Sequence, residues 1–375
     1  MMNGKRTLGV IFGGRSGEHE VSLMSARSVF PVINTAKYEI IPIGITQQGV
    51  WISAPGATGA EVLDALQTGK MGRLTRVSLL PEAGQAVLYA IGEDRLEANA
   101  HLDVVFPLLH GTFGEDGTMQ GLLELTDLAY VGAGVLSSSV GMDKALFKDV
   151  MRAHGLPVVE SITATRAQIE QDAQGVIARA EVLGSYPLFT KPANLGSSVG
   201  ITKCRTRSDL YEGLMESAAY DRRVLIERGV PDAREIEVAV LGNEHPQASV
   251  VGEIRPSADF YTYEAKYLDE RSELMIPAPL PQELQESIRQ LAVAAYTAID
   301  GAGMARVDFL VDPHTQEVFI SEVNTIPGFT KISMYPKLWD ASGLPYDALV
   351  DRLIELALER KAERDRTVRY FRRNV

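Results

Sequence analysis

Cysteine is nearly absent from this sequence, because Cys204 is the only one in 375 residues. One cysteine cannot form a disulfide within the chain, which agrees with a reducing compartment, and we interpret it as a structural residue. No segment approaches the ~20 consecutive apolar residues of a transmembrane helix. The first six residues also lack the apolar region of a signal peptide. We therefore expect a cytoplasmic protein that does not bind a membrane.

Positive charge is also scarce. There are 37 Lys and Arg residues against 49 Asp and Glu residues, which gives a net charge of −12. This balance disfavours a nucleic-acid partner, which requires a basic surface. The basic and aromatic residues 366–373 could form a nucleic-acid arm, but in so acidic a chain we interpret them as the solvated end of a helix. The hydrophobic content of 45% is typical of a globular protein.

The first part of the chain alternates between strand-like and helix-like patterns. Apolar runs at residues 7–12, 38–46 and 102–109 predict strands, and the apolar period after residue 18 predicts a helix. Such alternation predicts a parallel sheet that binds ligands at the carboxyl ends of its strands. Residues 48–100 have a weaker pattern, and we assign no chemistry to them. We place a first α/β domain at residues 1–140.

Two further units are expected after residue 140. Residues 141–230 combine short strands and helices into a small α+β lobe, and residues 231–375 form a second lobe with its own sheet. Residues 256–281 lie between a predicted strand and a predicted helix. They mix aromatic and charged side chains and are too numerous for a plain connection, so we predict a lid.

The segment RVDFLVDPHTQEVFISEVNTIPG, residues 306–328, predicts a β-hairpin with strands at 305–311 and 317–323. Because side chains alternate along a strand, Glu322 and Asn324 share one face, and Asp308 on the partner strand can join them. Oxygen ligands without cysteine or histidine suit Mg²⁺ held together with phosphates. The alternative is a solvated strand face with one carboxylate pair.

Phosphate binding is indicated in the small lobe. Lys144, Lys191 and the loop GSSVG at residues 196–200 offer cations and backbone donors. The loop lies between two predicted strands, and the Walker pattern GxxxxGK[ST] is absent. Alone, such a loop is more often a plain hairpin turn. The metal triad downstream favours the nucleotide interpretation.

The loop GGRSG at residues 13–17 does not fit the dinucleotide pattern GxGxxG, which disfavours a nicotinamide dehydrogenase. Glu18 follows this loop at the start of a helix. It can bind the ammonium group of a ligand, or it can simply complement the helix dipole.

Two positions near the hairpin can stabilise negative charge. Arg306 lies two residues before Asp308, on the same strand face, so its guanidinium can face phosphoryl or tetrahedral oxygens. The backbone N–H of Gly328 can approach an oxyanion closely because glycine has no side chain. The alternatives are a surface salt bridge and an ordinary Pro-Gly turn.

Taken together, the motifs GGRSGEHEVS, HGTFGEDGTMQG, KPANLGSSVG, FYTYEAKY, RVDF and EVNTIPGFT resemble the D-alanine–D-alanine ligase family of the ATP-grasp superfamily. The resemblance covers essentially the whole chain. It implies an ATP-grasp fold of mixed α/β and α+β character with an N-terminal parallel α/β domain. That first domain would bind the first D-alanine.

The resemblance also implies an activity. ATP would activate one D-alanine as an acyl phosphate, and the amine of a second D-alanine would displace phosphate to give the dipeptide used for peptidoglycan. Two Mg²⁺ ions, or Mn²⁺, would be held by Asp308, Glu322 and Asn324, and the protein would be a homodimer. The alternatives are a ligase that uses D-lactate or D-serine as second substrate and an ATP-binding module without catalysis.

The family's site residues are implied at matching positions of this chain. Tyr267 favours D-alanine over D-lactate as second substrate, whereas Thr262 and the Arg228-Gly229-Val230 run depart from the family's usual residues. The implied ATP-binding residues are Lys144, Lys191, Ser198, Glu227 and Glu235. The first D-alanine would contact Glu18 and His110, and the second D-alanine would contact Lys266, Ser333 and Met334. Arg306 and Gly328 would stabilise the tetrahedral intermediate, and hydrogen bonds among Glu18, Ser197 and Tyr267 would hold the lid closed.

Overall fold

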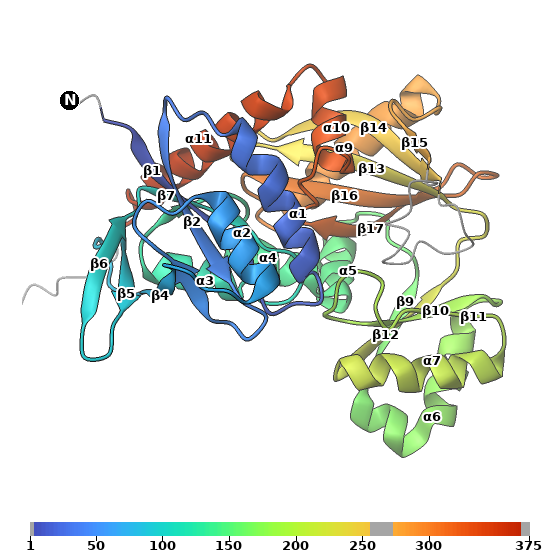
Figure 1. Ribbon diagram of the computed structural model, residues 1–375. Helices are drawn as coiled ribbons and strands as arrows, with labels where there is room; N and C mark the ends of the chain where they lie inside the picture. Colours follow the sequence, from blue (N-terminus) through green and yellow to red (C-terminus); the bar gives the residue numbers. More distant parts are fainter. Residues whose placement is uncertain (1–3, 256–272, 369–375) are drawn as a thin grey trace, which may run out of the picture.

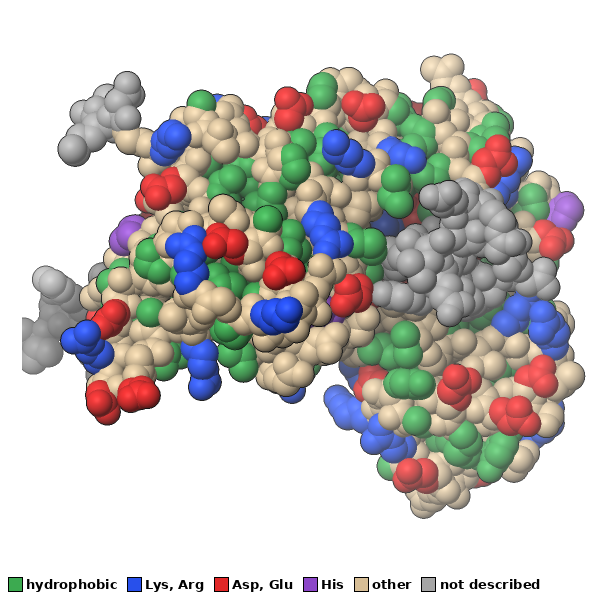
Figure 2. All heavy atoms as spheres, in the orientation of Figure 1, with side chains coloured by type: hydrophobic (Ala, Val, Ile, Leu, Met, Phe, Trp, Pro, Cys, Tyr) green, Lys and Arg blue, Asp and Glu red, His purple; other side chains and the backbone are tan. Residues whose placement is uncertain are grey.

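The computed structural model describes residues 4–255 and 273–368, which form three β-sheets with helices packed against them (Figure 1). The sheets follow one another along the chain. No helix in the described ranges is long and apolar enough to cross a membrane. Acidic and basic side chains are interspersed over α6 and α7 on the face that Figure 2 shows.

The first sheet has eight strands in the order β6-β5-β4-β3-β2-β1-β7-β8. Its parallel half was predicted by the apolar runs, because strands covered on both faces are apolar throughout. The parallel strands are β1 (Arg6–Gly13), β2 (Tyr38–Ile45), β7 (Val104–Leu108) and β8 (Ala129–Tyr130). The helices of this region are α1 (His19–Val29), α3 (Thr118–Leu125) and α4 (Val135–Met142).

Residues 48–100 extend this sheet with four antiparallel strands, so the sheet is parallel only in part. The strands are β3 (Trp51–Ser53), β4 (Thr75–Leu79), β5 (Val87–Ile91) and β6 (Leu96–His101), and the helix α2 (Gly59–Thr68) lies between the first two. The outermost strand, β6, has no buried residue. Short, half-exposed strands explain the weak sequence pattern of this region.

The second sheet has four antiparallel strands in the order β11-β10-β12-β9. The helices α6 and α7 cover one of its faces (Figure 1). Cys204 is fully buried in the core between them, and burial raises the pKa of its thiol to about 11. The elements are α5 (Lys144–Ala153), β9 (Ser161–Thr165), α6 (Arg166–Ala180), β10 (Leu188–Pro192), β11 (Thr202–Cys204), α7 (Arg207–Tyr220) and β12 (Arg223–Arg228).

The third sheet is antiparallel, in the order β15-β14-β13-β16-β17. The predicted hairpin is confirmed, with Asp308 opposite Glu322 and Arg306 opposite Asn324. The elements are β13 (Arg234–Leu241), β14 (Gln247–Arg255), β15 (Glu273–Met275), α9 (Gln282–Ala298), β16 (Met304–Val311), β17 (Val318–Asn324), α10 (Met334–Ala341) and α11 (Tyr346–Arg364).

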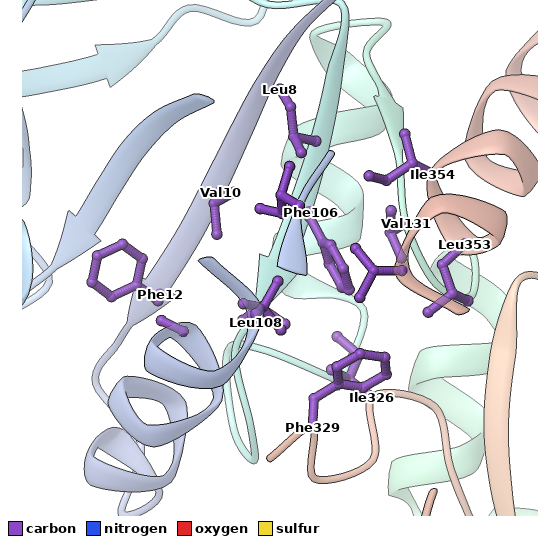
Figure 3. Packing of buried hydrophobic residues seen from close by; sticks show 14 of the residues in the cluster. Leu8, Val10, Phe12, Phe106, Leu108, Val131, Ile326, Phe329, Leu353 and Ile354 are labelled. Carbon is purple, nitrogen blue, oxygen red and sulfur yellow. The ribbon is translucent and has the colours of Figure 1, made fainter. Parts of the chain in front are cut away.

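One hydrophobic core joins the first sheet to the end of the chain (Figure 3). Phe106 of β7 packs edge-on against Phe329, with ring centroids 5.7 Å apart, and Leu353 of α11 lies in the same core. The segment after β17, which carries Ile326 and Phe329, is thereby held against the first sheet. This packing fixes the position of Gly328 between two buried side chains.

The small lobe offers a direct test of local helix capping. Thr206 accepts a hydrogen bond from the backbone N–H of Asp209, whose carboxylate in turn accepts one from the backbone N–H of Thr206. We predict that Thr206→Ala lowers the free energy of unfolding by about 1 kcal/mol, measured by urea titration. Ser208→Ala, at the exposed second residue of α7, is the control. Equal stability of the two variants would contradict this role of the cap.

Candidate active site

A cavity of about 830 Å³ brings together strands of the third sheet with loops and helices that accompany the first and second sheets. The hairpin β16–β17, the loop at residues 196–200 and the start of α1 all contribute to its walls. The sequence-predicted residues that line it are Glu18, His110, Lys144, Ser197, Ser198, Arg306, Glu322, Asn324, Gly328, Ser333 and Met334.

Some predicted residues lie elsewhere. The described lining residues of the cavity do not include Lys191, Glu227 or Glu235. They also do not include Asp308, which accepts a hydrogen bond from the lining residue Arg306. Lys266 and Tyr267 fall outside the described residues, as does Thr262, so the predicted lid contacts stay predictions.

Arg306 is held by two carboxylates, that of Asp308 on its own strand β16 and that of Glu237 on the neighbouring strand β13. Its Nε and Nη2 donate to the two oxygens of Asp308 at 2.7 and 2.6 Å, and Nε lies 2.9 Å from Glu237 Oε2. Burial opposes the charge of the guanidinium, but the two carboxylates outweigh it and raise the pKa of Arg306 well above its usual value. The site therefore contains a permanent, oriented cation.

The oxygens next to Arg306 suit a hard metal ion. Asp308 and Glu322 face each other across the hairpin, and Asn324 Nδ2 lies 3.0 Å from Asp308 Oδ2 and 3.4 Å from Glu322 Oε1. Two carboxylates and one side-chain amide provide oxygen donors, which fit Mg²⁺ or Mn²⁺. Lys144 Nζ, 3.8 Å from Glu322 Oε2, adds positive charge beside this donor set.

A second charged group lies between α5 and the second sheet. The carboxylate of Glu227 contacts the ammonium groups of Lys148 and Lys191. Burial alone would raise the pKa of Glu227, but the two lysines lower it to about 2. Glu227 is therefore ionised near neutral pH.

The carboxylate of Glu18 lies against two glycines rather than capping its helix. It makes no capping hydrogen bond to α1, and a Cβ on Gly196 would come within 2.6 Å of Glu18 Oε1. Ser197 and Ser198 have φ angles of 53° and 58°, in the left-handed region of backbone conformation that residues other than glycine rarely occupy. The Ser197 hydroxyl is buried and has no hydrogen-bond partner in the described part of the chain.

His110 is buried in the cavity wall, and both of its ring nitrogens have protein partners. Nδ1 lies 3.0 Å from the carbonyl of Ile326, and Nε2 lies 2.9 Å from Ser25 Oγ. Burial lowers the pKa of His110, although Glu18 opposes the shift. A neutral ring that donates from Nδ1 and accepts at Nε2 satisfies both contacts.

Sequence reasoning missed three charged residues of this region. Glu237 follows Glu235 by two residues on β13, so strand alternation could have found it. Lys148 follows Lys144 by one helical turn on α5, so helical spacing could have found it. Glu115 lies within the quoted motif HGTFGEDGTMQG but has no spacing signal of its own.

The glycine loop before α1 is shaped by protein contacts. The N–H of Gly13 donates to Ser22 Oγ and that of Gly14 to the carbonyl of Ile45. A Cβ on Gly13 would lie 2.2 Å from that same carbonyl oxygen. These two N–H groups are therefore not available to the phosphates of a dinucleotide.

Glu115 provides a test of the site's electrostatics. Burial raises its pKa from 4.5 to about 8, and the carboxylates of Glu18 and Glu322 add to the increase. The folded protein therefore binds an extra proton, and the resulting stabilisation is lost as the pH rises from about 4.5 to about 8. We predict that the Tm of the wild type minus that of Glu115→Gln decreases over this range.

Differential scanning fluorimetry from about pH 5 to about pH 9 measures this difference. Glu93→Gln, at an exposed position, is the control and should leave the difference constant. A constant difference for Glu115→Gln as well would contradict a raised pKa at this carboxyl.

Both the sequence and the fold of this chain are similar to those of known proteins. The family described as D-ala D-ala ligase N-terminus matches residues 7–133, and D-ala D-ala ligase C-terminus matches residues 150–355. The D-alanine–D-alanine ligase of Natranaerobius thermophilus is 48% identical over 363 residues, which cover 96% of this chain and 97% of that protein. That of Thermoanaerobacter sp. (strain X514) is 50% identical over 363 residues, covering 96% and 99%.

Two solved structures share the fold. The D-alanine–D-alanine ligase of Coxiella burnetii matches with a TM-score of 0.81 and 38% identity over 96% of each chain. The VanG D-Ala:D-Ser ligase of Enterococcus faecalis matches with a TM-score of 0.84 and 36% identity, over 94% of this chain and 100% of the other. The expected ATP-grasp fold with an N-terminal α/β domain is confirmed. With sequence and fold matched over nearly its whole length, the chain belongs to the D-alanine–D-alanine ligase family.

Proposed function

We propose that this protein is an ATP-dependent ligase that joins two D-alanines into D-alanyl-D-alanine, the dipeptide used for peptidoglycan. The observation that carries the proposal is the joint placement of Arg306, Glu322 and Glu18 around one cavity. A site with oxygens that suit a metal ion, an oriented guanidinium and a separate carboxylate can bind a polyphosphate and an amino acid next to each other. A silent ATP-binding module would not require this combination.

The nucleotide is proposed to bind between the second and third sheets. Lys144 lines the cavity and Lys191 lies beside it, so both can meet phosphate oxygens, and Ser198 belongs to the loop over them. Glu227 begins the segment that would read adenine, and Glu235 would bind the ribose. Lysine side chains and a loop of small residues suit a polyphosphate chain, which carries several negative charges.

The first D-alanine is proposed to bind between α1 and the loop at residues 196–200. Glu18 would receive its ammonium group, since this carboxylate lies in the cavity wall without a capping role. His110 would lie near its carboxylate. Both ring nitrogens of His110 already have partners, so we assign to it the shape of the wall rather than a proton transfer.

The second D-alanine is proposed to bind at the start of α10. Ser333 precedes this helix, and Met334 is its first residue. The side chain of Met334 is buried in the core, so its backbone N–H is the group that can meet a carboxylate. Lys266 would complete this subsite from the predicted lid.

The chemistry needs one attack on phosphorus and one on carbon. The carboxylate of the first D-alanine attacks the γ-phosphate of ATP, ADP leaves, and an acyl phosphate forms. The amine of the second D-alanine then attacks the acyl carbon, loses a proton and displaces phosphate. Arg306 and the Gly328 N–H would stabilise the tetrahedral oxygen. Ser197, Glu18 and Tyr267 would hold the lid closed, which excludes water from the acyl phosphate.

Asp308, Glu322 and Asn324 would hold two Mg²⁺ ions. When bound, such ions neutralise phosphate charge and orient the transferring group, and Mn²⁺ suits the same oxygen donors. Arg306 keeps the Asp308 carboxylate oriented through two hydrogen bonds. We propose three domains: residues 1–140 bind the first D-alanine, residues 141–230 form the small ATP-binding lobe, and residues 231–375 carry the metal site and the lid.

A ligase that uses D-serine as second substrate is the second candidate, because the fold also matches a D-Ala:D-Ser ligase. By its resemblance to the family, Tyr267 would favour D-alanine over D-lactate as second substrate. Separating the products formed from D-alanine alone and from D-alanine with D-serine or D-lactate distinguishes these candidates. A mixed product that outweighs D-alanyl-D-alanine would replace the first proposal with the second.

We predict that ADP release with ATP and Mg²⁺ depends on D-alanine and does not respond to L-alanine. Glu322→Gln should abolish turnover, by about 10³-fold or more, because the neutral amide cannot balance a metal ion. The near-isosteric change should leave the circular dichroism spectrum and Tm close to those of the wild type. If the wild-type protein releases ADP at a rate that does not depend on D-alanine, the proposed ligase function is wrong. Full activity of Glu322→Gln would remove this residue from the metal site.

The protein is proposed to act in the cytoplasm as a homodimer. Leu125 on α3 and Leu136 on α4 are 64% and 59% exposed, and the two helices are in contact. Large exposed apolar side chains on neighbouring elements are typical of an interface. We predict that Leu136→Asp converts the wild-type dimer into a monomer in sedimentation velocity, whereas Val182→Asp, also exposed, does not. A wild-type monomer would contradict the dimer.

A further inference from the structure

Lys148 is the most deeply buried charged side chain beside the proposed nucleotide site. Its side chain is 2% exposed, whereas that of Lys191 is 18% exposed. Within the described residues its ammonium contacts one group only, the Oε1 atom of Glu227. Lys191 contacts the other oxygen, Oε2. One carboxylate is therefore shared between two ammonium groups.

The positions of these three residues follow from their elements. Lys148 lies one helical turn after Lys144 on α5, so the two lysines share one face of the helix. Lys144 is directed toward the cavity and donates to the carbonyl of Leu195 at 2.7 Å. Lys191 on β10 and Glu227 on β12 belong to adjacent antiparallel strands. Of the three lysines, Lys144 is the one among the described lining residues of the cavity, and Lys148 is the most buried.

A buried carboxylate that loses its partner is strongly destabilised, because its desolvation is no longer compensated. If Lys191 were the only partner of Glu227, its movement toward a phosphate would leave that carboxylate unpaired. Lys148 removes this penalty, since it stays on Oε1 while Lys191 moves. Burial lowers the pKa of Lys148, but Glu227 opposes the shift.

We propose that Lys148 is a positioning residue that holds Glu227 through Oε1, so that Lys191 can transfer from Oε2 to a nucleotide phosphate. Once Lys191 has moved, Oε2 is an acceptor that faces the nucleotide. An acceptor suits the exocyclic amine of adenine and not the oxygen that hypoxanthine carries at the same position. Lys148 would thereby couple phosphate binding to base selection. This inference rests on the proposed nucleotide site.

The test compares Lys148→Met, Lys148→Arg and the control Arg152→Met in the full-length protein. Arg152 lies one turn further along α5, is 40% exposed and pairs with Asp149, so it shares the helix without touching Glu227. Steady-state kinetics with ATP and ITP give KM and kcat for each nucleotide and KM for D-alanine. Calorimetry of ATP binding without D-alanine gives Kd directly.

For Lys148→Met we expect KM and Kd for ATP to rise about tenfold, with kcat changed by less than about twofold. The preference for ATP over ITP should fall, and KM for D-alanine should not change. Lys148→Arg should recover most of the ATP affinity, and Arg152→Met should resemble the wild type. A folded Lys148→Met protein that binds ATP like the wild type overturns the inference. So does an equal loss of kcat with both nucleotides at unchanged KM, which would indicate a structural role only.

The double variant Lys148→Met/Glu227→Gln covers the case in which Lys148→Met does not fold. It removes both charges of the buried pair, so no carboxylate is left unpaired. If Lys148 acts through Glu227, the double variant should bind ATP as Glu227→Gln does, and a further loss would overturn the inference. Failure of the proposed function is recognised separately, by wild-type ATP binding without D-alanine-dependent ADP release.

Discussion

The charge pair between Arg306 and Asp308 is the interaction on which the site depends. A guanidinium buried without partners would be costly, and Asp308 and Glu237 compensate it from two strands of the same sheet. Because both carboxylates lie on paired strands, the sheet register fixes the direction of the cation. The oxygens of the hairpin and the guanidinium of Arg306 are therefore placed relative to one another by the same sheet.

The rest of the cavity is built around this unit by packing. Phe329 lies in a core with Phe106, which holds the segment after β17 against the first sheet. Glu18 lies at the start of α1, after the loop that follows β1, and the missing side chain of Gly196 lets the second lobe approach it. Three sheets thus meet at one cavity, where an amino acid and a polyphosphate can be brought together.

Much of the hairpin could be predicted from the sequence, because strand alternation alone places Arg306 and Asp308 on one face. The antiparallel extension at residues 48–100 could not, since its short and half-exposed strands lack a clear period. Roles such as those of Ser333 and Met334 came only from family resemblance. The spacing of residues along the chain does not indicate which substrate would bind at the amino end of a helix such as α10.

The sequence by itself determined the elements and their local chemistry, because periodicity, turn residues and motif spacing act over a few residues. It predicted which strand carries Asp308. Only the tertiary structure decided that Lys148 and Lys191 share the carboxylate of Glu227, and that Glu115 lies half-buried near Glu18 and Glu322. These contacts join residues far apart in the chain, and burial sets their electrostatics, so no local pattern records them.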